Sequence, residues 1–266
     1  MEWGFAYLLL GAGIGFLGGL FGIGGGTLLV PLLLLLFDAQ HFPPEHLLHL
    51  ALGTSMATIL FTALASLLKH NQHGAVNWRV VRTITPGILI GTALGTLLAS
   101  RIPVYLLGLI FALFVYCAAA QILLDIRPPA SRQLPRSLIV RLFGVFAGTL
   151  SSLVSIGGGT VVIPFLTWSN FTLRQAIGTS AAISFPVALG GTAGYVLTGL
   201  GAPGLPAASL GYVYLPALLW TALASVFTAP LGAKATHHLN TGLLRKLFAV
   251  LLLALASKLL LKTLGY

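Results

Sequence analysis

Long apolar runs separated by short polar stretches fill the whole chain. Several runs approach the ~20 residues that a helix needs to cross the hydrocarbon core of a bilayer. No long polar stretch leaves room for a separate soluble domain. The clearest runs are residues 47–68, 83–100, 104–124, 212–231 and 243–264. The pattern predicts an all-α polytopic membrane protein, with residues 1–266 forming one membrane domain.

Two glycine triplets mark an internal repeat. Residues 15–31 read GFLGGLFGIGGGTLLVP and residues 148–164 read GTLSSLVSIGGGTVVIP, with nine of seventeen positions identical. A second block follows each triplet, because ALGTS at 51–55 returns as AIGTS at 176–180. Matching blocks in the same order are typical of a duplicated unit. We predict two copies of one transmembrane unit, at about residues 1–125 and 137–266, joined by a cytoplasmic linker at about 126–136.

Each glycine triplet interrupts a segment that is too long for one crossing. The 33 residues from Phe5 to Phe37 would extend about 50 Å as a helix. Glycine disfavours helix, so the break is expected at the triplet. The chain then either continues as one broken crossing or turns and returns to its starting side as a hairpin.

The distribution of positive charge favours the hairpin. In the hairpin arrangement eleven of the 14 Lys and Arg residues share one side of the membrane, whereas a broken crossing divides them nine to five. Cytoplasmic loops carry the excess of such residues. The eleven are Lys69, Arg79, Arg82, Arg127, Arg132, Arg136, Arg141, Arg174, Lys234, Arg245 and Lys246, and the other three are Arg101, Lys258 and Lys262.

The hairpin arrangement predicts two inverted repeats. Each repeat holds a glycine-broken hairpin and three transmembrane helices, which makes six full crossings in the chain. Because three is odd, the second repeat is inverted relative to the first, as in many secondary transporters. Both termini are then expected in the periplasm.

The broken hairpins are also the best candidate for a substrate site. Irregular backbone at membrane depth is tolerated where it lines a cavity, and the helix after each triplet begins with unpaired amides at its positive end. Such a helix start suits an anion. The candidate binding residues are Gly24, Gly25, Gly26, Thr27, Thr54, Ser55, Ser152, Ser155, Gly157, Gly158, Gly159, Thr160, Thr179, Ser180 and Arg174.

Each candidate has a structural alternative. Glycines at these spacings also allow close helix packing, and Ser and Thr hydroxyls also bond back to helix carbonyls. For the triplets themselves we expect a methyl group to strain any glycine with positive φ. Arg174 either attracts the anion at the cytoplasmic mouth or serves as an ordinary positive-inside anchor.

Acidic residues are rare in this chain. Charged residues make up 7% of it, against about a quarter in soluble domains, and the four acids Glu2, Asp38, Glu45 and Asp125 lie near segment ends. Cation carriers and proton pumps usually hold a carboxylate within the membrane. The composition therefore argues against a metal-cation or sodium transporter.

The histidines have spacings that occur in metal sites, at His46/His49, His70/His73 and His237/His238. No Cys or carboxylate accompanies them in a recognisable motif, and they fall at segment boundaries. We therefore predict interfacial histidines, with no metal and no cofactor.

The expected partners are a small anionic substrate and the lipid bilayer, with a homo-oligomer left open. The net charge of +10 does not indicate nucleic acid, because the basic residues are scattered at the ends of apolar runs. An intramembrane enzyme is an alternative, but the serines near the second triplet have no mid-span histidine to activate them. A non-transporting assembly protein is another, and it leaves the paired hairpins unexplained.

The duplicated motifs, GGLFGIGGGTLLVP with ALGTS and SSLVSIGGGTVVIP with AIGTS, resemble the TauE/SafE family of sulfite and organosulfonate exporters. Residues 69–78 and 210–213 also resemble that family, and the resemblance covers nearly the whole chain. It implies transport of small sulfur-containing anions, such as sulfite, sulfoacetate or thiosulfate, across the bacterial inner membrane. The first repeat departs from an even pattern by about eight extra residues around Asp38 to His49.

Overall fold

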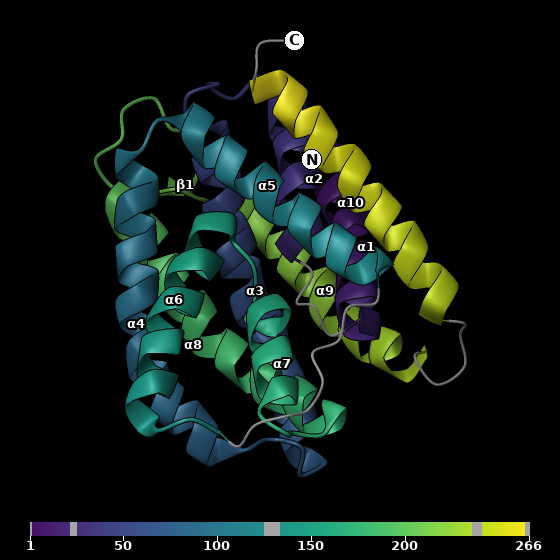
Figure 1. The fold of residues 1–266 in the computed structure, drawn as a ribbon. Helices are drawn as coiled ribbons and strands as arrows, with labels where there is room; N and C mark the ends of the chain where they lie inside the picture. The colour runs from purple at the N-terminus through teal and green to yellow at the C-terminus, as the bar shows by residue number, and fades with distance from the viewer. Residues whose placement is uncertain (1, 22–25, 125–133, 236–240, 264–266) are drawn as a thin grey trace.

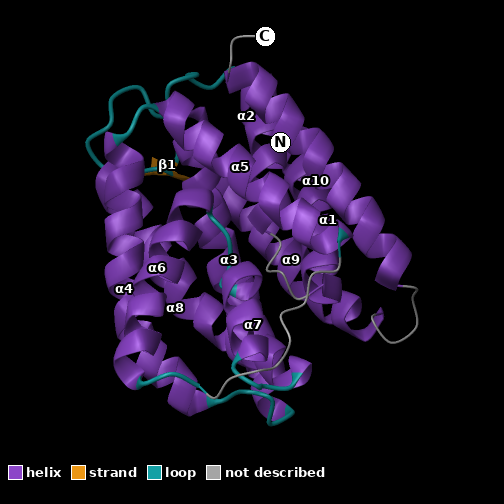
Figure 2. Ribbon diagram, in the orientation of Figure 1, coloured by secondary structure: helices purple, strands orange, loops and turns teal. Residues whose placement is uncertain are grey.

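A computed structural model describes residues 2–21, 26–124, 134–235 and 241–263. The first half forms α1 (Glu2–Phe21), α2 (Gly26–Ala39), α3 (Leu47–Gln72), α4 (Trp78–Arg101) and α5 (Val104–Leu123). The second half forms α6 (Ser137–Val154), α7 (Gly159–Trp168), α8 (Leu173–Gly199), α9 (Leu215–Ala235) and α10 (Thr241–Thr263). Two short antiparallel strands, β1 (Ser209–Leu210) and β2 (Val213–Tyr214), join α8 to α9 (Figures 1 and 2).

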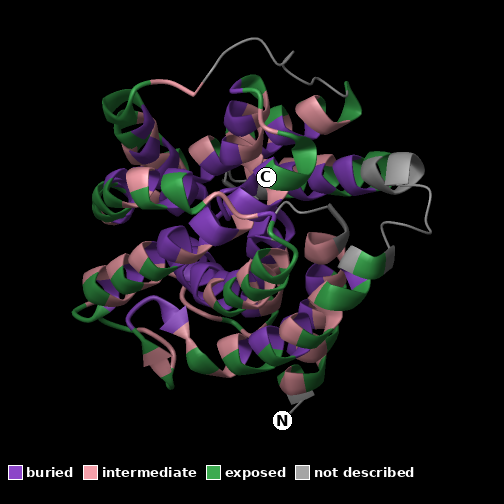
Figure 3. Cartoon of the chain, turned by 90° about the horizontal axis from the view of Figure 1, so that it is seen from below, coloured by how far each residue is buried: buried purple, intermediate pink, exposed green. Residues whose placement is uncertain are grey.

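The helical membrane fold predicted from the sequence is confirmed. Six helices within the described residues are long and apolar enough to cross a membrane, namely α3, α4, α5, α6, α8 and α9. Buried residues gather in the middle of the bundle (Figure 3), whereas large apolar side chains such as Leu113, Phe146 and Phe227 are 60–70% exposed. An apolar exterior over an apolar core fits a lipid environment.

The list of membrane-length helices differs in one member from the expected crossings. It includes α6, which the sequence assigned to the second hairpin and which is 18 residues long, about 27 Å. It leaves out α10, which has 23 residues. Some side chains of α10 are outside the described part of the chain. The second hairpin therefore has one long arm and one short arm, since α7 has only 10 residues.

Both glycine-broken segments turn back on themselves. In the first, Tyr7 near the start of α1 contacts Phe37 near the end of α2, with ring centroids 6.3 Å apart, so the two helices run antiparallel. In the second, the chain passes along α6, turns at Ser155 and comes back through α7 (Figure 1). The start of α7 lies against the middle of α8, where a Cβ atom on Gly158 would be 3.6 Å from the Ser184 hydroxyl.

The two halves are interleaved. α1 packs on α9 and α6 packs on α4, while α3 packs on α8 and α5 packs on α10. If α1–α5 are matched in order with α6–α10, exchanging the halves turns the first two pairs into each other and leaves the last two pairs unchanged. At the centre α3 and α8 run antiparallel, because Gly53 lies beside Tyr195 and Gly191 lies beside Met56.

The ends of the bundle differ in charge. At one end, the start of α1 and the end of α10 lie near the end of α2, as Tyr7 contacts Phe37 and Lys258 shares a cavity with Asp38. Arg101, which ends α4, belongs to the same end, because α5 then begins in that cavity at Val104. The other described basic residues are at or near helix ends that point the opposite way, and they are Lys69, Arg79, Arg82, Arg136, Arg141, Arg174, Lys234 and Lys246. The bias that favoured the hairpin is thus present in the fold.

The extra residues of the first repeat lengthen α2 and its connection to α3. α2 has 14 residues, whereas its counterpart α7 has 10. The added segment is packed, since Phe42 lies 5.2 Å from Phe37 and 5.0 Å from Tyr214 between ring centroids. It therefore binds the end of the first hairpin to the loop that precedes α9.

Glycines on one face of α1 allow its backbone to touch α9. A Cβ atom on Gly15 would lie 2.5 Å from the Cα of Ser225 and 2.3 Å from the Thr228 hydroxyl, whereas one on Gly13 would meet nothing within 4 Å. Small residues at such seams let helix backbones approach closely in membranes.

We expect Gly15→Ala to lower thermal stability and Gly13→Ala, on the open face of the same helix, to leave it unchanged or slightly raise it. The methyl group at position 15 must push α1 away from α9, and overpacking of this kind costs about 1–3 kcal/mol. Thermal unfolding of the two variants in the same detergent measures the difference. Equal melting temperatures would show that the seam is not packed as described.

Candidate anion site between the hairpin breaks

The second hairpin break is held by hydrogen bonds to two helices. Ser155, which follows α6, has left-handed backbone angles of φ 51° and ψ 50°, and its hydroxyl donates to the Leu52 carbonyl of α3. The Ile156 amide donates to the Ser151 carbonyl at 3.0 Å. Gly158 has φ −53°, so the strain expected for a triplet glycine with positive φ does not apply to it. The left-handed residue is a serine three positions earlier, and a hydrogen bond to α3 stabilises it.

The two breaks meet inside the molecule. α2 begins at Gly26, and a Cβ atom there would lie 2.3 Å from the Ser155 carbonyl oxygen and 3.4 Å from the Cα of Ile156. The first helix after one triplet thus touches the turn of the other hairpin. Two of the predicted site residues, Gly24 and Gly25, lie outside the described residues.

The two Gly-Thr-Ser blocks have matching structural roles. The Thr54 hydroxyl accepts a hydrogen bond from the Tyr214 amide at 3.0 Å, and the Thr179 hydroxyl accepts one from the Asn77 amide at 2.9 Å. Tyr214 is the residue before α9 and Asn77 is the residue before α4, so each threonine holds the start of a helix in the other half.

The glycines of these blocks make that approach feasible. A Cβ atom on Gly53 would lie 2.3 Å from the Tyr212 carbonyl oxygen, and one on Gly178 would lie 2.7 Å from the Ala75 carbonyl oxygen. A side chain at either position would collide with backbone. Both threonines and both glycines therefore join the two halves.

Serines of α6 bond mainly to carbonyls. The Ser152 hydroxyl donates to the Gly148 carbonyl at 2.9 Å, one turn earlier, and the Ser152 carbonyl accepts from the buried Tyr195 hydroxyl at 2.8 Å. Together with the bond from Ser155 to α3, this places two candidate hydroxyls in structural hydrogen bonds. Nothing in the local sequence marks Tyr195 as their neighbour.

Four candidate hydroxyls are buried without a hydrogen-bond partner among the described residues: Thr27, Ser55, Thr160 and Ser180. Thr27 and Thr160 directly follow the two triplets, and Ser55 and Ser180 end the two Gly-Thr-Ser blocks, so they form two repeat-related pairs. Buried polar groups in proteins are nearly always paired, and an unpaired hydroxyl costs about 1–3 kcal/mol. The same feature thus recurs at matching positions of both halves.

Other buried polar atoms also lack partners among the described residues. They are the Ser151, Thr192 and Ser209 hydroxyls and the His49 Nδ1. The three hydroxyls are not repeated in the matching positions of the other half. Among the described residues, only the hydroxyls of Thr27, Ser55, Thr160 and Ser180 are buried, lack a partner and occur at matching positions of both halves.

The start of α7 also lacks a side-chain cap. Its N-cap residue is Gly158, which offers no side-chain hydrogen bond, whereas α8 is capped by Thr172 and Gln175. The first amides of α7 are therefore left at the positive end of the helix, next to Thr160. This is the arrangement that suits a bound anion.

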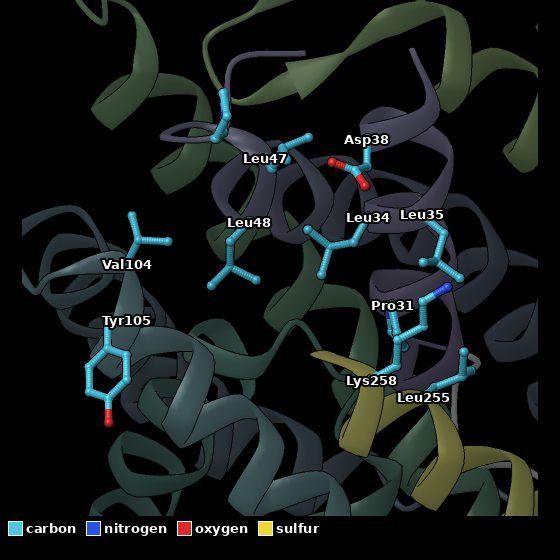
Figure 4. A pocket seen from close by; sticks show the side chains of 11 residues that line it. Pro31, Leu34, Leu35, Asp38, Leu47, Leu48, Val104, Tyr105, Leu255 and Lys258 are labelled. Atoms are coloured by element: carbon cyan, nitrogen blue, oxygen red, sulfur yellow. The ribbon is translucent and has the colours of Figure 1, made fainter. Parts of the chain in front are cut away.

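The candidate site is closed in this structure. Thr27 and Ser55 are fully buried, and Ser180 is 1% exposed. A cavity of about 320 Å³ lies elsewhere, between the ends of α2, α3, α5 and α10, where Asp38 and Lys258 face it (Figure 4). None of the candidate binding residues lines it. An anion can therefore reach the four hydroxyls only after helices move.

Arg174 lies at the exposed start of α8 and outside this closed region. Its Nη2 donates to the His73 carbonyl at 3.2 Å, beyond the end of α3. A cation at a helix C-terminus is electrostatically favourable. The contact ties α8 to α3, which is consistent with an anchor.

No cluster of three or more His, Cys, Asp or Glu side chains that could hold a metal occurs among the described residues. His237 and His238 lie outside them. His46 bonds to the Pro203 carbonyl at 2.9 Å and His73 to the Lys69 carbonyl at 2.8 Å, so both have structural contacts at helix ends.

Comparison with known proteins gives a consistent result. Residues 7–259 match the family model described as sulfite exporter TauE/SafE. The chain is 38% identical to a probable membrane transporter protein of Haemophilus influenzae, covering 96% of this chain and 97% of that one. It is 28% identical to the probable membrane transporter protein MJ0441 of Methanocaldococcus jannaschii, over 92% and 91% of the two chains. No solved structure matches the chain.

Proposed function

Because the chain belongs to the TauE/SafE family of membrane transporters, we propose that it carries a small sulfur-containing oxyanion or sulfonate between its two hairpin breaks. Sulfite, sulfoacetate and thiosulfate are the candidate substrates. The observation that carries the proposal is the set of four buried, unpartnered hydroxyls in two repeat-related pairs: Thr27 with Thr160 and Ser55 with Ser180.

Hydroxyl and amide donors match the chemistry of an oxyanion. A sulfite or sulfonate group presents three oxygens that must exchange their water for protein donors on entering a closed site. Each hydrogen bond to a charged group contributes about 1.5–3 kcal/mol, and a helix start adds about 0.3–2 kcal/mol. Donors without a fixed counter-charge bind the anion without forming a salt bridge that would oppose its release.

The same site supports alternating access. We place the two repeats in the membrane with opposite orientations and both termini in the periplasm. The antiparallel packing of α3 on α8, and the exchange of helix pairs between the halves, support this arrangement. Transport then requires the interleaved halves to move so that the hydroxyls open to one side at a time.

Purified protein in liposomes is expected to take up radiolabelled sulfite, thiosulfate or sulfoacetate in a saturable way, and chloride should not compete. The reason is that the proposed site offers several directed donors to a multi-oxygen anion. The measurement is uptake by protein-containing vesicles compared with empty vesicles. If the protein moves none of the three anions and instead hydrolyses a peptide or lipid, the intramembrane enzyme alternative is correct.

A further inference from the structure

His49 is a buried histidine inside the membrane bundle. It is the third residue of α3 and is only 6% exposed, although the sequence predicted an interfacial side chain. Its Nε2 lies 2.9 Å from the Ala99 carbonyl oxygen, so this nitrogen carries a hydrogen and donates it. Its Nδ1 is buried and has no hydrogen-bond partner among the described residues. The described acids Asp38 and Glu45 are exposed, so the interior offers no described carboxylate as a proton carrier.

The groups around His49 have opposing effects on a positive charge on its imidazole ring. Ala99 lies in the last turn of α4, which ends at Arg101, so its carbonyl belongs to the negative end of that helix. The Tyr212 ring stacks on the imidazole with centroids 4.9 Å apart and planes inclined by 29°. Both contacts favour the imidazolium, whereas burial favours the neutral ring. The Ala99 carbonyl and the Tyr212 ring would hold an imidazolium if a movement of the helices reduced the burial of His49.

Several titratable groups lie around His49. On α3 itself His46 is one turn earlier, with Glu45 next to it and 3.8 Å from the His46 Nε2. The loop before α9 contributes Tyr212, and α4 contributes Arg101, whose side chain is exposed two residues after Ala99. A charge on His46 opposes a positive charge at His49, whereas the Glu45 carboxylate and the Arg101 side chain are exposed at the surface.

His49 is connected to the proposed anion site by α3. Leu52, one turn along the helix, accepts the hydrogen bond of Ser155 at the second hairpin break. Gly53, four residues after His49 and therefore on the same face, packs against the carbonyl of Tyr212, the residue whose ring stacks on His49. A proton on His49 thus acts on the contacts that join α3 to both the break and the loop before α9.

The repeat adds an independent observation. His49 occupies the position that Arg174 occupies in the second half, since each lies five residues before the threonine of its Gly-Thr-Ser block. α3 and α8 run antiparallel, so the two residues lie at opposite ends of the bundle. One end of the repeat pair therefore has a permanent cation, and the other has a cation that depends on protonation.

We propose that His49 binds the proton that crosses the membrane together with the anion, an inference that rests on the proposed function. The proton adds to the lone pair of Nδ1, which then becomes a second donor. It leaves from the same nitrogen after the anion has gone. The net event is the movement of one proton with one anion, with no other chemical change.

The test separates proton coupling from anion binding. His49→Gln keeps an N–H donor for the Ala99 carbonyl but does not titrate. The probe is radiolabelled thiosulfate, or sulfite or sulfoacetate if wild type exchanges only one of these. Two rates are measured per folded molecule, namely anion exchange between equal concentrations without a pH gradient, and net uptake driven by a pH gradient. His73→Gln, at the exposed end of α3, is the matched control.

We expect His49→Gln to retain exchange within about twofold and to lose gradient-driven uptake down to the rate seen without a gradient, while His73→Gln keeps both. Gradient-driven uptake that persists in His49→Gln overturns the proposal, and so does loss of exchange in a folded variant. If wild type exchanges the anion but ignores the pH gradient, the proton role is wrong and the proposed function stands. If wild type exchanges none of the three anions, the proposed function itself fails. His49→Asn replaces His49→Gln if the latter does not fold, and loss of folding in both shows a purely structural histidine.

Discussion

Loss of the four unpartnered hydroxyls is expected to abolish transport while leaving the fold intact. Single changes Thr27→Val, Ser55→Ala, Thr160→Val and Ser180→Ala should each reduce anion uptake by about 10- to 100-fold, which corresponds to one hydrogen bond to a charged group. None of these hydroxyls has a hydrogen-bond partner among the described residues, so their removal breaks no hydrogen bond seen in this structure. Uptake per folded molecule and the melting temperature of each variant are the two measurements.

The neighbouring threonines provide the control. Thr54→Val and Thr179→Val remove the acceptors of the Tyr214 and Asn77 amides, so they should lower stability by about 1–3 kcal/mol. The two sets thus separate binding from folding at adjacent positions of the same helices. Normal uptake in all four variants of the first set would show that the anion does not contact these hydroxyls.

The fold could be predicted from the sequence where the information is local or repeated. Apolar runs located α3, α4, α5, α9 and α10, and the glycine triplets located the breaks to within one residue, since α2 begins at Gly26 and α7 at Gly159. The positive charges also favoured the turn back at each triplet. These signals depend on residues within one or two turns of each other, or on a preference that holds along the whole chain.

The candidate site was only partly predictable, because the partner of a hydroxyl is set by tertiary contacts. Thr54 and Ser55 are adjacent and look equivalent in the sequence. The Thr54 hydroxyl accepts a hydrogen bond from the amide of Tyr214, about 160 positions away, whereas the Ser55 hydroxyl has no partner among the described residues. The side chains of neighbouring residues in a helix point about 100° apart, so Thr54 faces the loop before α9 and Ser55 faces the interior. The same reasoning explains Ser155, whose left-handed backbone depends on a carbonyl of α3.

His49 shows the same limit for burial. Near the start of an apolar run, a histidine is expected at the membrane interface, as His46 is at the partly exposed end of α3. His49 is buried because the loop before α9, in the second half of the chain, covers it and stacks the Tyr212 ring on the imidazole. The pattern of apolar residues along α3 cannot reveal that a residue about 160 positions later covers His49.

Two glycines at the breaks should differ in how a methyl group affects the stability of the fold. A Cβ atom on Gly26 would lie 2.3 Å from the Ser155 carbonyl oxygen and 2.8 Å from the Ile59 side chain, so Gly26→Ala must force the two hairpin breaks apart. A Cβ atom on Gly158 would be 3.4 Å from Ile183 and Val162, an ordinary contact, and φ there suits any residue. We expect Gly26→Ala to lose both thermal stability and transport.

Gly158→Ala is the sharper of the two changes, because it should fold normally. Its stability is expected to stay within about 1 kcal/mol of wild type, the usual range for an N-cap glycine replaced by alanine. Its methyl group adds bulk beside the unpaired amides at the start of α7, so anion uptake per folded molecule should fall at least about tenfold, the equivalent of about 1.4 kcal/mol of lost binding. The melting temperature and the uptake rate of both variants, measured on the same preparations, decide the outcome. Wild-type uptake by a stable Gly158→Ala protein would mean that the anion does not approach the start of α7. The amides there would then hydrogen-bond to water instead.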